Sequence, residues 1–167
     1  MRLVEHQSRK LLSGYGIAFT DSVVVSTAAE AAAAARRIGG TVMIKAQVPF
    51  GGRAKAGAVW SAETPEAAAR EAEQLLATDL RGVPVTSVSV ESKVRFSREL
   101  YAGIAWDTTD RLPVALLSTS GGIDVELSDE HVARQTFDPS SGLAADDSRS
   151  MAAKLGLDGR TLEAAAT

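Results

Sequence analysis

The sequence predicts an α+β fold built from two small lobes, and two patterns support this prediction. In the first half of the chain, short β-branched segments alternate with alanine-rich helical segments, as in a βαβ unit. From about residue 83 the pattern changes to closely spaced strand segments with a hairpin signal, which favours antiparallel pairing. We expect the lobes to meet near residues 92–97, with a ligand held in a cleft between them.

The helices of the first half have recognisable ends. An amphipathic helix near the N-terminus should end at Gly14. Thr27 is placed to cap the alanine-rich helix that follows strand 22–26, with Glu30 three residues on as its capping-box partner. Thr64 is placed to cap a further helix, with Pro65 at its first position, which we expect to run to about residue 77.

The remaining elements are predicted from alternation and turn chemistry. A turn at residues 108–111 should join two strands as a hairpin. We expect strands at 42–45, 58–61, 88–91, 98–106, 114–118 and 123–127, and helices at 148–155 and 161–166. The last helix looks as though it has just begun where the chain stops, so we expect a truncated second lobe.

Composition excludes several classes of function. The 167 residues contain no cysteine, which rules out disulfides and thiolate metal sites, and His6 and His131 have no metal-ligand spacing. The net charge of -3 gives no reason to expect nucleic acid. No apolar run approaches the ~20 residues of a membrane span, and the N-terminus lacks a signal-peptide pattern. We therefore expect a cytoplasmic protein without a membrane partner.

A glycine-rich loop carries the clearest chemical signal in the chain. The apolar strand 42–45 ends at Lys45, and the loop that follows holds Gly51, Gly52, Arg53 and Lys55. Glycines let several backbone N–H groups point at one anion, and the cations suit phosphate oxygens. The loop matches neither the P-loop nor the dinucleotide fingerprint. A purely structural turn with solvated cations is the alternative at this stage.

Several blocks then follow one known pattern in order. They resemble the amino-terminal ATP-grasp portion of the β subunit of succinyl-CoA synthetase (succinate–CoA ligase, ADP-forming), an enzyme of the tricarboxylic acid cycle, over essentially the whole chain. The blocks are residues 3–12, 15–17, 44–48, 51–57, 98–103 and 118–126. The resemblance implies an ATP-grasp-like fold with three parts. Residues 1–20 would form a helix packing on the second lobe, 21–95 the first lobe with the phosphate loop, and 96–167 a partial second lobe.

The resemblance also implies a phosphate site. Lys45 matches the lysine that meets the nucleotide phosphates, and the three-residue phosphate-loop segment falls on Gly52, Arg53 and Ala54. Ala54 stands where the family usually has glycine, and Phe50 precedes the glycine pair where a smaller residue is expected. If the backbone φ at Ala54 were positive, its Cβ would strain the loop by about 1 kcal/mol or more.

The nucleoside contacts are implied in the same way. Glu91 and Val94 match the hinge between the lobes beside the adenine, and Glu99 matches the carboxylate expected to hold the ribose hydroxyls. A carboxylate accepts two ribose O–H groups in other nucleotide sites as well. Taken without the family, Glu91 and Glu99 would be read as solvated strand ends or as ion pairs with Lys93 or Arg98.

The implied reaction converts ATP, an acid and CoA to acyl-CoA, ADP and phosphate, with the phosphoryl group passing through a histidine of a partner α subunit. ATP and Mg²⁺ are implied, but the family's magnesium ligands do not fall within this chain, so we name no catalytic and no metal-binding residue. We expect a catalytically incomplete part that binds nucleotide and either an α-type CoA-ligase subunit or itself. A non-catalytic nucleotide-binding or oligomerising module derived from the family is the alternative. The acid, and ATP against GTP, stay open.

Overall fold

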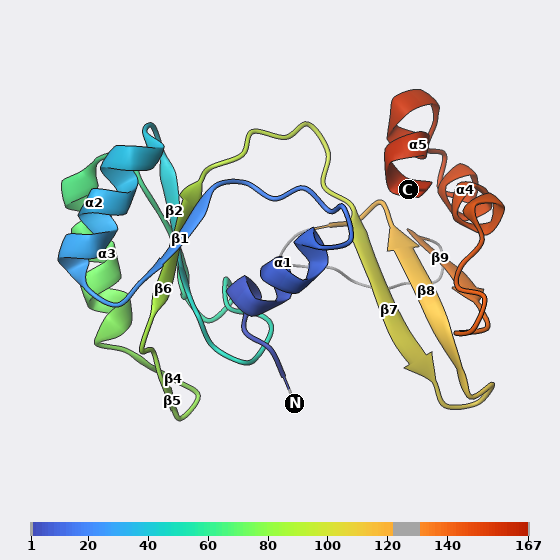
Figure 1. Cartoon of the computed structure of the whole chain (residues 1–167), viewed down its shortest axis with the longest axis horizontal. Coiled ribbons are helices and arrows are strands. Elements are labelled where there is room, and N and C mark those ends of the chain that lie inside the picture. The colour runs from blue at the N-terminus through green and yellow to red at the C-terminus, as the bar shows by residue number, and fades with distance from the viewer. Residues whose placement is uncertain (1, 122–130, 167) are drawn as a thin grey trace. The chain divides into compact units, whose positions relative to one another are not determined.

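The computed structural model describes residues 2–121 and 131–166 (Figure 1). The chain divides into two compact units, Met1–Arg95 and Phe96–Thr167. None of the helices in the described part has the length and apolar character needed to cross a membrane. The predicted strand at 123–127 lies outside the described residues.

The first unit is built on a four-stranded sheet. Its strands lie in the order β1 (Ser22–Val25), β6 (Val88–Ser92), β2 (Val42–Ala46) and β3 (Val59–Ala62), and every neighbouring pair is antiparallel. The predicted strands are therefore confirmed. β1 and β2 run in the same direction, as in a βαβ unit. They do not pair with each other, because β6 lies between them and pairs with both.

Two helices, α2 (Ala28–Ile38) and α3 (Pro65–Leu76), cover one face of this sheet (Figure 1). Their predicted caps are confirmed. The Thr27 hydroxyl accepts the Glu30 N–H at 3.2 Å, and the Glu30 carboxylate accepts the Thr27 N–H at 3.2 Å, which completes the capping box. The Thr64 hydroxyl likewise accepts the N–H of residue 67, and Pro65 begins α3 as expected.

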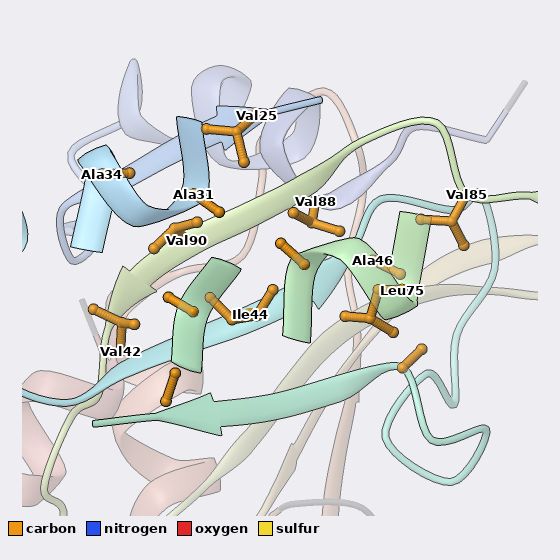
Figure 2. Packing of buried hydrophobic residues seen from close by; sticks show 14 of the residues in the cluster. Val25, Ala31, Ala34, Val42, Ile44, Ala46, Leu75, Val85, Val88 and Val90 are labelled. Atoms are coloured by element: carbon orange, nitrogen blue, oxygen red, sulfur yellow. The ribbon is translucent and has the colours of Figure 1, made fainter. Parts of the chain in front are cut away.

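Alternate residues of the central strands fill the core beneath these helices (Figure 2). Ile44 of β2 and Val90 of β6 are fully buried, and small side chains such as Ala31 of α2 let the helices approach the sheet closely. Because side chains alternate along a strand, the residues between these point to the other face. That second face carries polar groups, including Lys45 and Glu91.

A short hairpin follows α3, with strands β4 (Asp79–Leu80) and β5 (Val83–Pro84). Its turn consists of Arg81, with φ +56°, and Gly82, with φ +80°. The carboxylate of Asp79 accepts the Gly82 N–H at 2.6 Å and fixes the turn. These strands are too short to have been predicted from alternation.

The second unit is a three-stranded antiparallel sheet in the order β7 (Tyr101–Asp107), β8 (Leu112–Ser118) and β9 (Val132–Thr136). The predicted hairpin between β7 and β8 is confirmed, whereas β9 was not predicted. Helices α4 (Ala145–Lys154) and α5 (Gly159–Ala166) follow. Leu117 of β8, residue 133 of β9 and Met151 of α4 form a separate, smaller core.

The predicted N-terminal helix is confirmed as α1 (Glu5–Ser13). It ends at Gly14, as expected, but none of its residues is buried, and Leu11 remains 55% exposed within the chain. Side chains of α1 form ion pairs with residues of β2, β6 and the glycine-rich loop. In the first unit α1 is therefore attached by polar contacts and not by an apolar face.

Candidate functional site

The polar face of the first sheet and the first turns of α1 together form a charged cluster. Its members are Glu5 and Arg9 of α1, Lys45 of β2, Arg53 of the glycine-rich loop and Glu91 of β6. Lys45 and Glu91 reach the same side because each occupies the outward phase of its strand. We call these five residues the cation–carboxylate cluster.

Glu91 forms the buried floor of the cluster. Only 3% of the residue is exposed, and its carboxylate pairs with the Lys45 ammonium and with the Arg9 guanidinium. Arg9 is itself held in place, because it donates to the Thr20 carbonyl at 2.7 Å and to the Thr20 hydroxyl at 3.1 Å. A buried carboxylate needs such partners, since an unpaired charge at this depth would cost several kcal/mol.

Glu5 links the other side of the cluster to the glycine-rich loop. One carboxylate oxygen lies 3.5 Å from the Lys45 ammonium, and the other accepts a hydrogen bond from Arg53. Burial pushes the pKa of Glu5 up, but the Arg53 hydrogen bond and the charges of Lys45, Arg53 and Arg9 outweigh it and hold the pKa below its ordinary value. Glu5 is therefore a stable carboxylate that two cations share.

The glycine-rich loop is a defined turn. The N–H of residue 56 donates to the Gly52 carbonyl at 3.1 Å, and that of residue 58 donates to the Arg53 carbonyl at 2.8 Å. Gly52 and Gly57 have φ of +72° and +70°, a region that favours glycine. Arg53 also donates to the carbonyl of residue 46 at 2.8 Å, which ties the loop to the end of β2.

The departure at Ala54 does not strain this turn. Of the described non-glycine residues, only Arg81 and Arg111 have a positive φ, so Ala54 keeps an ordinary backbone conformation. Phe50, the other departure, is half-buried against the core of the first unit. Its ring also lies 5.0 Å from the guanidinium carbon of Arg81.

The predicted site residues divide between the two units. Lys45, Arg53 and Glu91 meet in the cation–carboxylate cluster. Val94 follows β6 in the first unit and is 51% exposed. Glu99 belongs to the second unit and is also exposed.

Gly121 lies against Glu99 within the second unit. A Cβ added to Gly121 would come within 2.7 Å of the Glu99 carbonyl carbon, so a larger residue there would displace the Glu99 backbone.

Sequence reasoning missed the contributions of Glu5, Arg9 and Gln47. The Gln47 side-chain oxygen accepts from the His6 backbone N–H at 3.0 Å and lies 3.0 Å from the His6 ring Nδ1, which docks α1 beside β2. A signal was available for the first two, because Glu5 and Arg9 are four residues apart and so share one helix face. No such local signal marks Gln47.

The whole chain matches a known family. An ATP-grasp domain model (ATP-grasp_2) matches residues 2–167. The chain belongs to the ATP-grasp family. The resemblance inferred from the motifs is confirmed by curated relatives. The β subunit of succinate–CoA ligase [ADP-forming] from Rubrobacter xylanophilus is 41% identical over 96% of this ATP-grasp chain. The β subunit from Haloarcula marismortui is 39% identical over 95%. The chain spans 43% and 42% of their lengths, respectively.

Solved structures confirm the α+β ATP-grasp fold. Ca. Korarchaeum cryptofilum ACD1, solved in complex with coenzyme A, is 25% identical, with a TM-score of 0.74 over 99% of this chain and 75% of its own. PH1788 from Pyrococcus horikoshii is 21% identical, with a TM-score of 0.71 over 90% of this chain and 64% of its own. At 21% identity, the match to PH1788 supports the fold alone.

Proposed function

We propose that this chain is the nucleotide-binding part of an ADP-forming acid–CoA ligase, and that Lys45 and Arg53 bind the nucleotide phosphates. The observation that carries the proposal is that both side chains converge on one anionic group, the Glu5 carboxylate. Two cations that share one carboxylate are spaced to share one phosphate, because the acceptor oxygens are similar in size and charge. The turn at Gly52 would add backbone N–H groups as further donors to the phosphate.

The charge balance of the cluster supports an added anion. Three cations, Lys45, Arg53 and Arg9, face two carboxylates, Glu5 and Glu91, which leaves one positive charge. A polyphosphate supplies the missing negative charge. Lys45 and Arg53 are only 23% and 18% exposed, so their attraction for a phosphate is less screened than it would be on an open surface.

Glu91 has a positioning role in this proposal. Its carboxylate already binds Lys45 and Arg9, and its strand is paired on both sides, with Ser22 opposite it in β1 and Met43 in β2. We therefore propose that Glu91 orients Lys45 toward the phosphates.

The proposed nucleoside contacts come from residues outside the cluster. Val94, just past the end of β6, would offer its backbone to the adenine. Glu99 would accept the ribose hydroxyls through its exposed carboxylate. Gly52 and Ala54 would contribute backbone N–H groups to the phosphates.

The overall reaction is proposed from the relatives' names and from the resemblance. ATP, an acid and CoA would give acyl-CoA, ADP and phosphate, with succinate as the acid in the named relatives. Their designation as β subunits supports an α-type partner for this chain as well. ATP would bind as its Mg²⁺ complex, as membership of the family implies, and we assign no metal ligand to this chain.

Calorimetry with ATP–Mg²⁺ and with ADP tests the proposal. We expect wild type to bind ATP and Lys45→Ala to lose at least about tenfold in affinity, because one charge-assisted phosphate contact is removed. Arg36→Ala is the matched control. Arg36 of α2 pairs with Glu66 of α3, and both side chains are more than half exposed, so its loss should leave binding unchanged.

Two outcomes would overturn the proposal. One is the absence of any ATP binding by folded wild type, and the other is equal ATP affinity in wild type and Lys45→Ala. Because Lys45 also partners the buried Glu91, the variant's far-UV circular dichroism must match that of wild type. Arg53→Ala is a second variant that leaves the Lys45–Glu91 pair intact and should weaken binding in the same direction.

A further inference from the structure

Arg81 brings a further cation to the glycine-rich loop. It occupies the turn between β4 and β5, and its guanidinium carbon lies 5.0 Å from the centre of the Phe50 ring. A Cβ added to Gly52 would lie 3.7 Å from the Arg81 Nη2 atom, which places the guanidinium in contact with that side of the loop. Arg81 is 29 positions from Gly52 in the sequence, so no local motif reveals this proximity.

The pairing of Arg81 differs from that of the other cations near the loop. Lys45 and Arg53 each have a carboxylate partner in the cation–carboxylate cluster. Within the part of the chain that the structure describes, no carboxylate lies at ion-pair distance from Arg81, which is also exposed. The Phe50 ring supports its guanidinium from one side, and its planar donor fork remains available to an acceptor.

The backbone at Arg81 is unusual for an arginine. Its φ of +56° lies in the left-handed region, which glycine, asparagine and aspartate adopt more readily than long side chains. Gly82 follows it, and the Asp79 carboxylate fixes the turn through the Gly82 N–H. A long cationic side chain is thus kept in a strained turn that a smaller residue would form more easily.

We propose that Arg81 is an additional phosphate-contacting residue, which binds the polyphosphate end of the nucleotide beside Gly52. The inference deepens the proposed function and rests on it. The ligand class is a nucleoside di- or triphosphate, because Arg81 adjoins Gly52 of the phosphate loop. Its fork can donate two parallel hydrogen bonds to one phosphate.

A purely structural role makes a different prediction. If Arg81 only covers the Phe50 ring, its replacement should change stability and leave nucleotide affinity as it is. If Arg81 binds phosphate, its replacement should weaken ATP while sparing adenosine, which has no phosphate. Comparing the affinities for ATP and for adenosine therefore distinguishes the two roles.

The test compares Arg81→Asn and Arg81→Lys with wild type by calorimetry, using ATP, ADP and adenosine. Asparagine tolerates the left-handed backbone and removes the charge, whereas lysine keeps the charge and loses the planar fork. Arg111→Asn is a backbone-matched control, because Arg111 has φ +54° in the turn between β7 and β8 of the second unit. It changes the net charge by the same amount.

We expect Arg81→Asn to weaken ATP about fivefold to tenfold and Arg81→Lys about twofold to threefold, in line with one partly exposed charge-assisted contact. Adenosine affinity should stay within about twofold in every variant, and Arg111→Asn should match wild type for all ligands. Equal ATP affinity in Arg81→Asn and wild type would overturn this inference and leave the proposed function standing. So would an equal loss for ATP and adenosine. A wild type that binds no ATP would instead overturn the proposed function.

Discussion

The carboxylate of Glu5 joins three parts of the first unit that are distant in sequence. It belongs to α1, and its partners are Lys45 at the end of β2 and Arg53 in the glycine-rich loop. The same carboxylate occupies the position that we assign to a phosphate oxygen. A bound phosphate must therefore compete with Glu5 for the two cations, and the balance between the two anions sets the affinity of the site.

The lowered pKa of Glu5 predicts how stability depends on pH. Because the folded-state pKa lies below the ordinary value of 4.5, the carboxylate stabilises the fold above that pH, and the contribution disappears as pH falls through the folded-state pKa. At neutral pH, Glu5→Gln should lower the free energy of unfolding by about 1–2 kcal/mol, since the side chain is only partly exposed. Urea denaturation of wild type and variant should show this difference shrinking as the pH falls below 4.5.

Glu63→Gln provides the control for that measurement. Glu63 is exposed just before α3, and a surface substitution of this kind changes stability by less than about 0.5 kcal/mol. If Glu5→Gln and wild type were equally stable at neutral pH, the bridging role of Glu5 would be wrong.

At the residue scale, the sequence predicted the cations at the glycine-rich loop better than the residues that pair with them. Lys45 and Arg53 stand out because they lie before and within a glycine-rich segment, and such a segment with cations indicates a turn that can bind an anion. Glu91 could equally have been a solvated strand end or a partner of Lys93, and only the pairing of β6 with β2 brings it to Lys45. Arg9 reaches Glu91 across 82 positions, and no local pattern encodes such a contact.

At the scale of elements, capping chemistry predicted the helix starts well. The hydroxyls of Thr27 and Thr64 each accept the backbone N–H three residues further on, so these caps depend only on local sequence and can be predicted from it. The attachment of α1 could not be predicted in this way. Its apolar periodicity indicates an amphipathic helix, but in the first unit it is held by ion pairs with Lys45, Arg53 and Glu91.

Strand β7 carries the clearest element-scale prediction. Among the strands that the structure describes it lies at the edge of its sheet, and Ile104 and Trp106 on one of its faces are 73% and 61% exposed. An exposed apolar edge strand favours pairing with another chain, so we expect the protein to self-associate at high concentration. The double variant Ile104→Lys, Trp106→Lys should shift the species seen by size-exclusion chromatography with light scattering toward monomer.

A suitable control replaces a large exposed side chain that lies outside any strand. Tyr15 is 78% exposed in the segment after α1, so Tyr15→Lys should leave the association state unchanged. A wild type that remains a single monomeric species at about 100 μM, where weak association is normally visible, would count against an associating β7 edge.

At the scale of the whole molecule, the sequence predicted two α+β lobes because the strand pattern changes partway along the chain. It did not predict the order β1-β6-β2-β3, in which the last strand of the unit enters between the first two. That order depends on packing Ile44 of β2 and Val90 of β6 into one core beneath the helices, and such tertiary packing cannot be predicted from local sequence patterns. The family resemblance supplied the ATP-grasp topology that local patterns could not.

The separate cores predict that the first unit folds alone. Residues 1–95 contain a complete sheet, two covering helices and the larger of the two hydrophobic clusters. A fragment of these residues should unfold cooperatively in urea and should bind inorganic triphosphate within about twofold of the full chain, because Lys45 and Arg53 are retained. It lacks Glu99, so its ATP affinity should fall by about fivefold, the size of one exposed hydrogen-bonding contact.

The Lys45→Ala fragment tests whether this binding uses the proposed site, since it should lose triphosphate as the full-length variant loses ATP. The comparison with Glu99→Ala in the full chain separates two causes of weaker ATP binding. If Glu99 acts on the ribose, that variant should reproduce the fragment's ATP affinity while binding triphosphate normally. If Glu99→Ala binds ATP as tightly as wild type, the ribose role is wrong, and any loss in the fragment must come from other residues of the second unit.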